Sequence, residues 1–342
     1  MKVLVVGGAG YIGSHMVKML LERDHAVTVL DNLSSGHRDA VAHQARLVVS
    51  DLSQRGAVYQ LLERNYFEAV MHFASFIDVA ESVRDPARYY ENNVANTLKL
   101  LDAMVANRIM RFVFSSSAAV YGRPDYLPID ETHALHPINP YGFSKYVVER
   151  MLSDYEIAYG LKSVTLRYFN AAGADPDGTL GERHDPETHL IPLLLQAASG
   201  RRNGVEIFGR DYDTPDGTCI RDYVHVNDLC QAHLAALERM RLGLSSDMYN
   251  LGNGSGFSVL EVISAVEQVT GKTIPVRNAS RRPGDPARLV ADAAKARAEL
   301  GWSPQFPGIQ EIVEHAWKWE LKQSREAAAG KKQQDPVRAS FA

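Results

Sequence analysis

Within its first thirteen residues the chain passes from a short apolar segment into a glycine-rich turn. Val3–Val6 leads directly to Gly7, Gly10 and Gly13, which are spaced as G-x-x-G-x-x-G and precede a stretch with apolar residues at helical spacing. Such glycines allow a tight turn and let backbone N–H groups approach a pyrophosphate at the N-terminus of the helix. The pattern therefore predicts a strand, a turn and a helix that together bind a dinucleotide.

An acidic residue stands where dinucleotide-binding folds place their ribose ligand. Asp31 ends the second apolar run and lies 18 residues after Gly13. A carboxylate at this point accepts hydrogen bonds from the adenosine ribose hydroxyls. Because it would repel the 2′-phosphate of NADP, we predict NAD as the cofactor, although the nearby Arg38 weakens this preference slightly.

Short apolar runs alternate with helix-length segments through the first half of the chain. The runs are continuous, which is typical of parallel strands that are buried on both faces. Alternating strands and helices predict an α/β fold with a Rossmann-like, doubly wound parallel sheet. The expected strands are Val3–Val6, Ala26–Leu30, Arg46–Val49, Ala69–Phe73, Phe112–Ser115 and Ser163–Phe169, and the longer expected helices are Pro86–Asn107 and Asn139–Tyr159.

The composition of the sequence changes after Asn170, and residues 173–186 are rich in Gly, Asp and Pro. We expect an NAD-binding Rossmann domain over residues 1–170, to which segments at about 219–252 return. A smaller mixed α/β domain over residues 171–322 should bind the substrate. The polar segment 323–342 is expected to be a flexible tail.

The composition is that of an ordinary globular protein. With 342 residues, of which 45% are hydrophobic and 23% charged, the chain is neither disordered nor a disulfide scaffold. Its net charge is −4, so the chain lacks the excess of basic residues that is typical of a nucleic-acid-binding protein. The two cysteines, Cys219 and Cys230, lack metal-ligand spacing, so we predict no metal site. Few cysteines and no apolar run of about 18 residues favour a cytoplasmic protein without membrane contact.

A tyrosine and a lysine supply candidate catalytic groups. Tyr141 and Lys145 follow Asn139 and Pro140, which suit a helix N-cap and first turn, so the two side chains should share one helix face. This spacing alone is not specific. Ser117 adds weight, because it closes the preceding predicted strand and catalytic groups gather at the carboxyl ends of strands in open α/β sheets.

These residue types suit the removal of a proton from an alcohol. A phenol has a pKa of about 10, and a base that works near pH 7 needs a pKa about three units lower, which is roughly 4 kcal/mol. One ammonium at about 4 Å supplies that order of energy at an effective dielectric of about 20. We therefore predict that Lys145 lowers the pKa of Tyr141, helped by a nicotinamide cation, and that Ser117 hydrogen-bonds the reacting oxygen.

An ordered series of short motifs runs from residue 7 to residue 285. Together they resemble the extended short-chain dehydrogenase/reductase family, and within it the branch of UDP-glucose 4-epimerases, over nearly the whole chain up to about Trp319. The resemblance implies NAD-dependent interconversion of UDP-glucose and UDP-galactose at the sugar C4, through a transient 4-keto sugar, by a homodimer. The motifs are GGAGYIGS, DNLSSG, HFA, NNVANT, SSSAAVYG, NPYGFSK, RYFNAAGA, HLIP, GTCIRDYVHV, YNLGNG and RRPGD.

The resemblance also implies roles for individual residues. The family's catalytic positions fall on Ser117, Tyr141 and Lys145, and two arginines suit clamps on a diphosphate. Besides the three glycines, Tyr141 and Lys145, the implied NAD contacts are Tyr11, Ile12, Asp31, Asn32, Asp51, Leu52, Phe73, Ala74, Asn92 and Phe169. The implied UDP-sugar contacts are Ser117, Asn170, His189, Leu190, Phe208, Arg221, Arg282 and Asp285, while His133, His136, His184 and Cys219 remain unassigned.

Two positions bear on the substrate. Many family members have Lys where this chain has Ile77, followed by Asp78, so one polar contact to the phosphates or sugar is missing or supplied otherwise. Leu289 falls where the family sizes the pocket around the sugar C2 substituent. It is smaller than the Tyr of restrictive members, so we expect it to leave space for the acetamide of UDP-GlcNAc.

Other functions remain open at this level. A UDP-GlcNAc or UDP-glucuronate 4-epimerase is not distinguished by these residues. A nucleotide-sugar 4,6-dehydratase would need an acidic pair after Ser117, where Ala118 and Ala119 stand. The intact Ser117, Tyr141 and Lys145 argue against a non-enzymatic NAD-binding protein, because such a protein would not need them.

Overall fold

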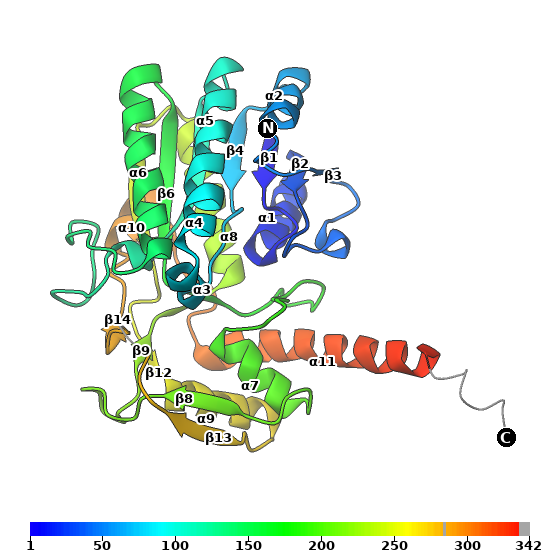
Figure 1. The fold of residues 1–342 in the computed structure, drawn as a ribbon, viewed down its shortest axis with the longest axis vertical. Coiled ribbons are helices and arrows are strands. Elements are labelled where there is room, and N and C mark those ends of the chain that lie inside the picture. The colour runs from blue at the N-terminus through cyan, green and yellow to red at the C-terminus, as the bar shows by residue number, and fades with distance from the viewer. Residues whose placement is uncertain (283–284, 335–342) are drawn as a thin grey trace.

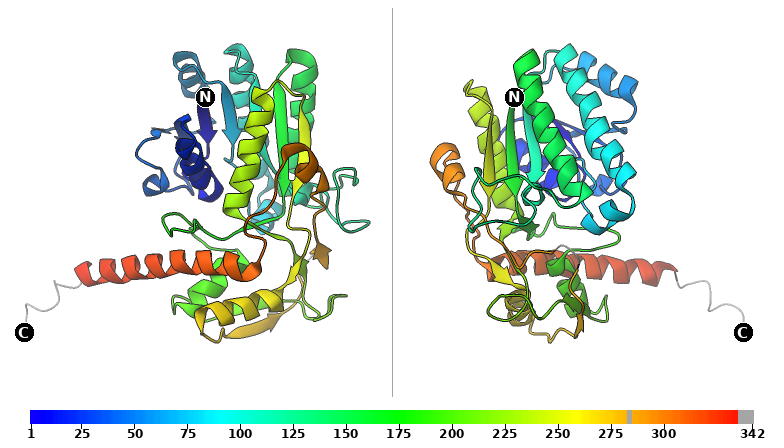
Figure 2. Two further views of the ribbon diagram at one scale, coloured as in Figure 1. Left: turned by 180° about the vertical axis from the view of Figure 1, so that it is seen from behind. Right: turned by 60° about the vertical axis from the view of Figure 1, so that its left-hand side comes forward.

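The computed structural model describes residues 1–282 and 285–334, except for the side chains of residues 328–334. Its larger part is a layer of seven parallel strands with helices on both faces, and its smaller part lies beyond the carboxyl ends of those strands (Figures 1 and 2). The predicted α/β fold with a doubly wound parallel sheet is confirmed. Among the described residues, no helix is long and apolar enough to span a bilayer.

The strands of the sheet follow the order β11-β6-β5-β4-β1-β2-β3, and all neighbours are parallel. In the interior strand β1 (Lys2–Val6), Val3 and Val5 pack into one hydrophobic core, while Leu4 and Val6 pack into a second core on the other face. None of the four is more than 1% exposed, which explains the continuous apolar run. The strands are β1 (Lys2–Val6), β2 (Ala26–Asp31), β3 (Arg46–Val49), β4 (Ala69–His72), β5 (Arg111–Ser117), β6 (Lys162–Tyr168) and β11 (Asp247–Leu251).

Helices cover both faces of this sheet. Two of them, α1 (Tyr11–Glu22) and α8 (Val226–Arg241), share the first core, and three others share the second. Helix α8 and strand β11 come from the stretch 219–252, and they pack against α1 and β6 of the larger part. The division of the chain into domains remains a prediction. The helices of the second core are α2 (Arg55–Arg64), α5 (Asn96–Ala106) and α6 (Pro140–Tyr159).

The smaller part has a third hydrophobic core. Three helices pack there with the parallel pair of β8 (Val205–Phe208) and β13 (Val276–Ala279). The helices are α7 (Leu190–Ala198), α9 (Val259–Thr270) and α11 (Ile309–Gln334). Two further short sheets join β7 (Asn170–Ala172) to β10 (Tyr223–His225), and β9 (Ile220–Arg221) to β12 (Phe257–Ser258) and β14 (Arg288–Leu289). The remaining short helices are α3 (Val79–Arg84), α10 (Ala294–Leu300) and the 3₁₀ turns η1 (Arg38–Ala40) and η3 (Ala118–Val120).

The segment expected as one helix over Pro86–Asn107 is interrupted. It consists of α4 (Pro86–Tyr89), a π-helical turn η2 (Tyr90–Ala95) and α5. In the π turn, the Asn93 side chain accepts a hydrogen bond from the N–H of Phe76 (2.9 Å) and donates one to its carbonyl (3.1 Å). The widened turn thus holds the loop that follows β4. Single π turns of this kind are frequent near functional sites.

Helix α11 extends further than expected. A flexible tail was predicted over 323–342, but the helix continues to Gln334, and the Ser324 hydroxyl donates to Glu320 (3.0 Å) inside it. The physical reason is that this segment is rich in Ala, Lys and Gln, which are good helix formers. The rest of the predicted tail, residues 335–342, lies outside the described residues.

A buried ion pair ties α6 to β6. Arg167, which is 1% exposed, donates to the Glu149 carboxylate from Nη2 (2.6 Å) and Nε (3.0 Å). The Ser116 hydroxyl donates to the same carboxylate, and Arg167 Nη1 donates to the Tyr121 hydroxyl (3.0 Å). Both charged groups therefore have several hydrogen-bond partners although they are buried.

We expect Glu149→Gln to lower the free energy of unfolding by about 3–5 kcal/mol, because it leaves the buried Arg167 charge without its partner. Urea or guanidinium unfolding measures this loss. The control is Asp154→Asn on the same helix, whose pair with Arg150 is exposed (69% and 58%) and should be worth less than about 1 kcal/mol. Equal losses in the two variants would contradict the prediction.

Candidate active site

The turn between β1 and α1 contains a contact that only glycine permits. A Cβ atom on Gly13 would lie 2.1 Å from the carbonyl oxygen of Gly7, which itself has φ +80°. Helix α1 has Gly10 at its N-cap and no side-chain cap. Its first N–H groups therefore point out of the turn without a side-chain partner, as binding of a phosphate group requires.

Asp31 is buried at the end of β2 and shapes the same turn. Its Oδ2 accepts a hydrogen bond from the N–H of Ala9 (2.9 Å), and its Oδ1 accepts one from Leu33 (2.8 Å). The next residue, Asn32, donates to Asp51 Oδ2 (2.5 Å). The glycine turn and these carboxylates lie together and fit the pyrophosphate and ribose of NAD.

The other predicted NAD contacts are arranged along the carboxyl edge of the sheet. Phe73 and Ala74 follow β4, and both donate their N–H to the carbonyl of Val6 (2.8 and 3.2 Å). Asn92 lies in the π turn and donates to Asn93 Oδ1 (2.9 Å). The Tyr11 hydroxyl points away from the glycine turn and donates to a carbonyl in the loop after β7, that of Gly173 (2.7 Å). Of the remaining predicted contacts, Ile12 is in α1, Leu52 follows β3 and Phe169 follows β6.

Tyr141 lies in the first turn of α6, beside the end of β5. The helix begins with Asn139, whose Oδ1 accepts the N–H of Gly142 (2.8 Å). Helix α6 approaches η3 so closely that a Cβ on Gly142 would lie 2.4 Å from the carbonyl oxygen of Ala119. This approach places the Tyr141 phenol on the same side as the Ser117 hydroxyl, which partly offsets the rise in its pKa.

Lys145 lies one helical turn further along and is 3% exposed. Its Nζ donates to the carbonyl of Ser115 and to the hydroxyl of Ser75, both at 2.8 Å. The same atom lies 5.9 Å from the centre of the Tyr141 ring. Burial lowers the pKa of Lys145 to about 7, and the charge of Glu149 opposes this only in part.

Burial also raises the pKa of Tyr141 above that of an ordinary phenol, and the hydrogen bond with Ser117 offsets only part of the rise. The expectation that Lys145, helped by a nicotinamide cation, lowers the pKa of Tyr141 stays a prediction. Burial disfavours the charged forms of both groups, the phenolate and the ammonium. A phenolate at this position requires a further positive charge beside it.

Residues predicted to hold the UDP-sugar form a group in the smaller part. Arg221 in β9 forms an ion pair with Asp285, and the Arg282 guanidinium lies 4.1 Å from the centre of the Phe208 ring at the end of β8. Asp285 also donates its N–H to the carbonyl of Arg282 (3.3 Å), which places Arg282 next to the Arg221–Asp285 pair. The structure thus brings both predicted phosphate clamps together.

Of three further predicted residues, two lie next to this group. Leu289 in β14 is paired in register with Arg221 and packs against the cluster of Ala118 and Tyr121, next to the end of β5. Asn170 begins β7 and donates its N–H to the carbonyl of Asp222 (2.9 Å). Leu190 is the first residue of α7.

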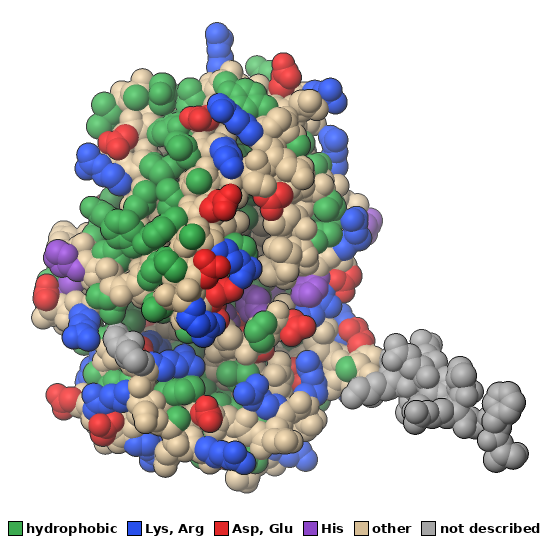
Figure 3. All heavy atoms as spheres, in the orientation of Figure 1, with side chains coloured by type: hydrophobic (Ala, Val, Ile, Leu, Met, Phe, Trp, Pro, Cys, Tyr) green, Lys and Arg blue, Asp and Glu red, His purple; other side chains and the backbone are tan. Residues whose placement is uncertain are grey.

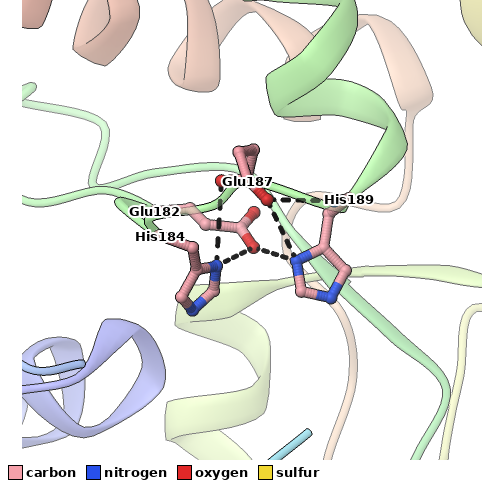
Figure 4. Close-up of side chains that lie close together, drawn as sticks. All are labelled: Glu182, His184, Glu187 and His189. Carbon is pink, nitrogen blue, oxygen red and sulfur yellow. Dashed lines mark hydrogen bonds and ion pairs between the residues drawn. The ribbon is translucent and has the colours of Figure 1, made fainter. Parts of the chain in front are cut away.

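His189 is the N-cap of α7, and it lies in a cluster that the sequence did not reveal. Its Nδ1 is 2.6 Å from Glu182 and 3.4 Å from Glu187, and His184 Nδ1 is 3.1 and 3.7 Å from the same two carboxylates (Figure 4). Burial works against charge here, but the two carboxylates raise the pKa of His184 to about 9 and that of His189 to about 10. The only sequence signal was the spacing E-x-H-x-x-E-x-H in a loop.

The two residues at which the chain departs from the family provide no positive charge. Ile77 is 42% exposed. Asp78 caps α3, where its Oδ1 accepts the N–H of Glu81 (2.9 Å). The expectation that one polar contact here is missing or supplied otherwise stays a prediction.

The fold, the glycine turn and the Ser–Tyr–Lys group define a protein that acts with a bound dinucleotide. The chain belongs to the NAD dependent epimerase/dehydratase family, whose model matches residues 3–252. The UDP-glucose 4-epimerase of Streptococcus mutans is 50% identical over 321 residues, which cover 93% of this chain and 96% of that protein. The predicted cofactor, NAD, and the predicted family resemblance are confirmed.

Solved structures agree with this assignment. The UDP-glucose 4-epimerase from Brucella ovis in complex with NAD is 49% identical, with a TM-score of 0.90 over 92% of this chain and 97% of that chain. The UDP-Glc/GlcNAc 4-epimerase from Campylobacter jejuni is 44% identical, with a TM-score of 0.82 over 94% of this chain and 99% of that chain.

We expect Gly10→Ala to lower the NAD content of the purified protein while leaving the fold intact. A Cβ there would meet the chain only at the Gly7 carbonyl, 3.4 Å away, and would extend into a hollow in front of α1. NAD released by acid gives the content, and circular dichroism checks the fold. The control is Gly56→Ala, whose Cβ meets nothing within 4 Å. A Gly10 variant with full NAD content would refute the proposed phosphate cradle.

Proposed function

We propose that the protein interconverts UDP-glucose and UDP-galactose by inverting C4 of the sugar through a transient 4-keto sugar, with NAD as a bound cofactor. One observation carries this proposal: the likeness to a UDP-glucose 4-epimerase extends over 93% of the chain at 50% identity, and the Ser–Tyr–Lys group is intact within it. When bound, NAD supplies a hydride acceptor and a positive charge; the side chains of the protein bind the sugar and move the proton.

In this proposal Tyr141 takes the proton from the sugar O4 and later returns it. Ser117 hydrogen-bonds the same oxygen and orients it toward the phenol. Because burial raises the pKa of Tyr141, the phenolate forms only with positive charge nearby. Lys145 in its protonated form, held by Ser75 and the Ser115 carbonyl, supplies part of that charge from the protein side.

The proposed diphosphate anchor consists of Arg221 and Arg282. Guanidinium groups bind phosphate oxygens with two hydrogen bonds at once, which fixes the UDP end of the substrate. The ion pair with Asp285 restrains the Arg221 side chain before substrate arrives. A substrate held firmly by its diphosphate can then turn its 4-keto sugar, so that either face of C4 is presented to the cofactor.

Tyr141→Phe should lower kcat for UDP-galactose epimerisation by about 10²–10⁴-fold, because it removes only the proton-transferring oxygen. The variant should retain its NAD and its melting temperature. Tyr155→Phe is the matched control, since that tyrosine lies on the same helix and hydrogen-bonds Asp102 instead. Near-wild-type epimerisation by the Tyr141 variant would overturn the proposed base.

A second substrate, UDP-GlcNAc, is supported by the position of Leu289 beside Arg221 and the end of β5. We propose that this side chain borders the pocket for the sugar C2 substituent and leaves space for an acetamide. The similar protein from Campylobacter jejuni is named a UDP-Glc/GlcNAc 4-epimerase.

Leu289→Tyr should then reduce turnover of UDP-GlcNAc more than tenfold and spare UDP-glucose, because the larger ring fills the space for the acetamide. Product separation after incubation with each sugar measures the two activities. Leu289→Met, which keeps the volume nearly unchanged, serves as the control. An equal effect on both sugars would show that Leu289 does not border this pocket.

We also propose that the protein is a homodimer that pairs through α5 and α6. Apolar side chains are exposed on these helices, among them Leu98 (41%), Phe143 (43%) and Ile157 (83%), and Figure 3 shows hydrophobic side chains gathered over this face. Such patches mark interaction surfaces. Light scattering should give twice the mass of one chain, and Phe143→Glu should give the mass of a monomer. The cytoplasmic location remains a prediction.

A further inference from the structure

The proposed reaction does not explain why four side chains of one loop converge between β7 and α7. Glu182, His184, Glu187 and His189 each contribute one nitrogen or oxygen atom, and these four atoms all lie within 4.8 Å of one another. Figure 4 shows both imidazole rings directed at the two carboxylates. The cluster needs a reason other than the orientation of a sugar.

The burial of the cluster makes its charge costly. The side chains of Glu182 and Glu187 are only 6% and 5% exposed. Two carboxylates that share a buried point require positive charge between them. The Nδ1 atoms of His184 and His189 are buried against these carboxylates without an aligned hydrogen bond. The two Nδ1 atoms and the carboxylate oxygens therefore crowd together inside the loop without satisfying one another by regular hydrogen bonds.

The distances match a tetrahedral metal site. Ligand atoms at about 2.0–2.1 Å from Zn²⁺ are roughly 3.3–3.4 Å apart along the edges of the tetrahedron. In the cluster, Glu182 Oε1 lies 2.6 Å from His189 Nδ1 and 3.1 Å from His184 Nδ1, and Glu187 Oε2 lies 3.7 Å from His184 Nδ1. One ligand atom from each of the four residues lies within 4.8 Å of the others, so a small shift brings them to these spacings. We propose that this loop binds one Zn²⁺ ion through His184, His189, Glu182 and Glu187.

The chemical types of the four ligand atoms indicate which metal ion the site prefers. Two imidazole nitrogens disfavour Mg²⁺ and Ca²⁺, which take oxygen ligands, and a four-coordinate site with nitrogen and carboxylate ligands suits Zn²⁺. Because all four ligands come from the protein, the site is structural and leaves no position for a substrate.

The surroundings hold the ligands in place, as outer contacts do in metal sites. The N–H groups of Thr188 and His189 donate to Glu187 Oε1 (2.7 and 2.9 Å), which leaves Oε2 for the ion. Trp319 of α11 donates its indole N–H to the carbonyl of Glu182 (2.9 Å). A hollow lined by Glu182, His184, Glu187 and Trp319 provides an entry path.

The position of the loop indicates what the ion does. The residue between the first two ligands, Arg183, forms an ion pair with Asp39, and its carbonyl lies 3.1 Å from His37 Nε2. The last ligand is the N-cap of α7. A zinc ion would therefore fasten the start of α7 to the loop after β2, and its effect is positional and stabilising rather than chemical.

The test uses the full-length protein, stripped with a chelator and then dialysed against Zn²⁺ or Mg²⁺. Mass spectrometry of the digested protein should find one zinc per chain and no magnesium, and Zn²⁺ should raise the melting temperature. His184→Ala should lose both effects, whereas His184→Cys should retain them because a thiolate also binds zinc. His43→Ala, at an exposed histidine, is the matched control and should behave as wild type.

Two results would overturn the proposal. No zinc in either the wild-type protein or His184→Ala would mean that paired imidazolium and carboxylate groups alone occupy the cluster. Zinc at the same level in wild type and in His184→Ala would mean binding by surface histidines. Neither readout depends on epimerase activity, so the zinc site and the proposed function succeed or fail separately.

Discussion

Helix α6 lies against the ends of β5 and β6, and the rest of the candidate site depends on this contact. Gly142 allows the backbone of the helix to approach Ala119, and two turns later the Glu149–Arg167 pair fixes the helix to β6. Between these two points the Lys145 side chain can only extend into the interior, toward the Ser115 carbonyl. A helix that stood farther from the sheet would leave Tyr141 and Ser117 apart.

The same contact determines the electrostatics of the site. Close packing removes water from the Tyr141 phenol and the Lys145 ammonium, so burial shifts both groups toward their neutral forms. Positive charge from a bound NAD beside the phenol would favour the phenolate. In the proposed function, proton removal is thereby coupled to the presence of a cofactor that remains bound through the reaction.

The parts of the structure that local patterns determine were predictable from the sequence. Strand β1, its glycine turn and the shared helix face of Tyr141 and Lys145 follow from residue spacing over less than ten positions. The π turn was not predictable, because it depends on how the Asn93 side chain meets the Phe76 backbone. The roles in UDP-sugar binding came from resemblance alone, and the pKa directions at the site needed burial, which no spacing reveals.

A diphosphate anchor is useful only if it is rigid relative to Tyr141, and a buried aspartate supplies that rigidity. Asp222 is 0% exposed and directly follows Arg221. Its carboxylate accepts the N–H groups of Asn253 (2.8 Å), Gly254 (3.1 Å) and Ala291 (3.1 Å), which ties the loop after β11 and the end of β14 to one point. β11 is itself a strand of the main sheet. The proposed anchor is therefore held in a fixed position relative to the sheet that carries the proposed catalytic groups. In the proposed function, such an anchor would fix the UDP end and confine to the sugar the freedom that inversion at C4 requires.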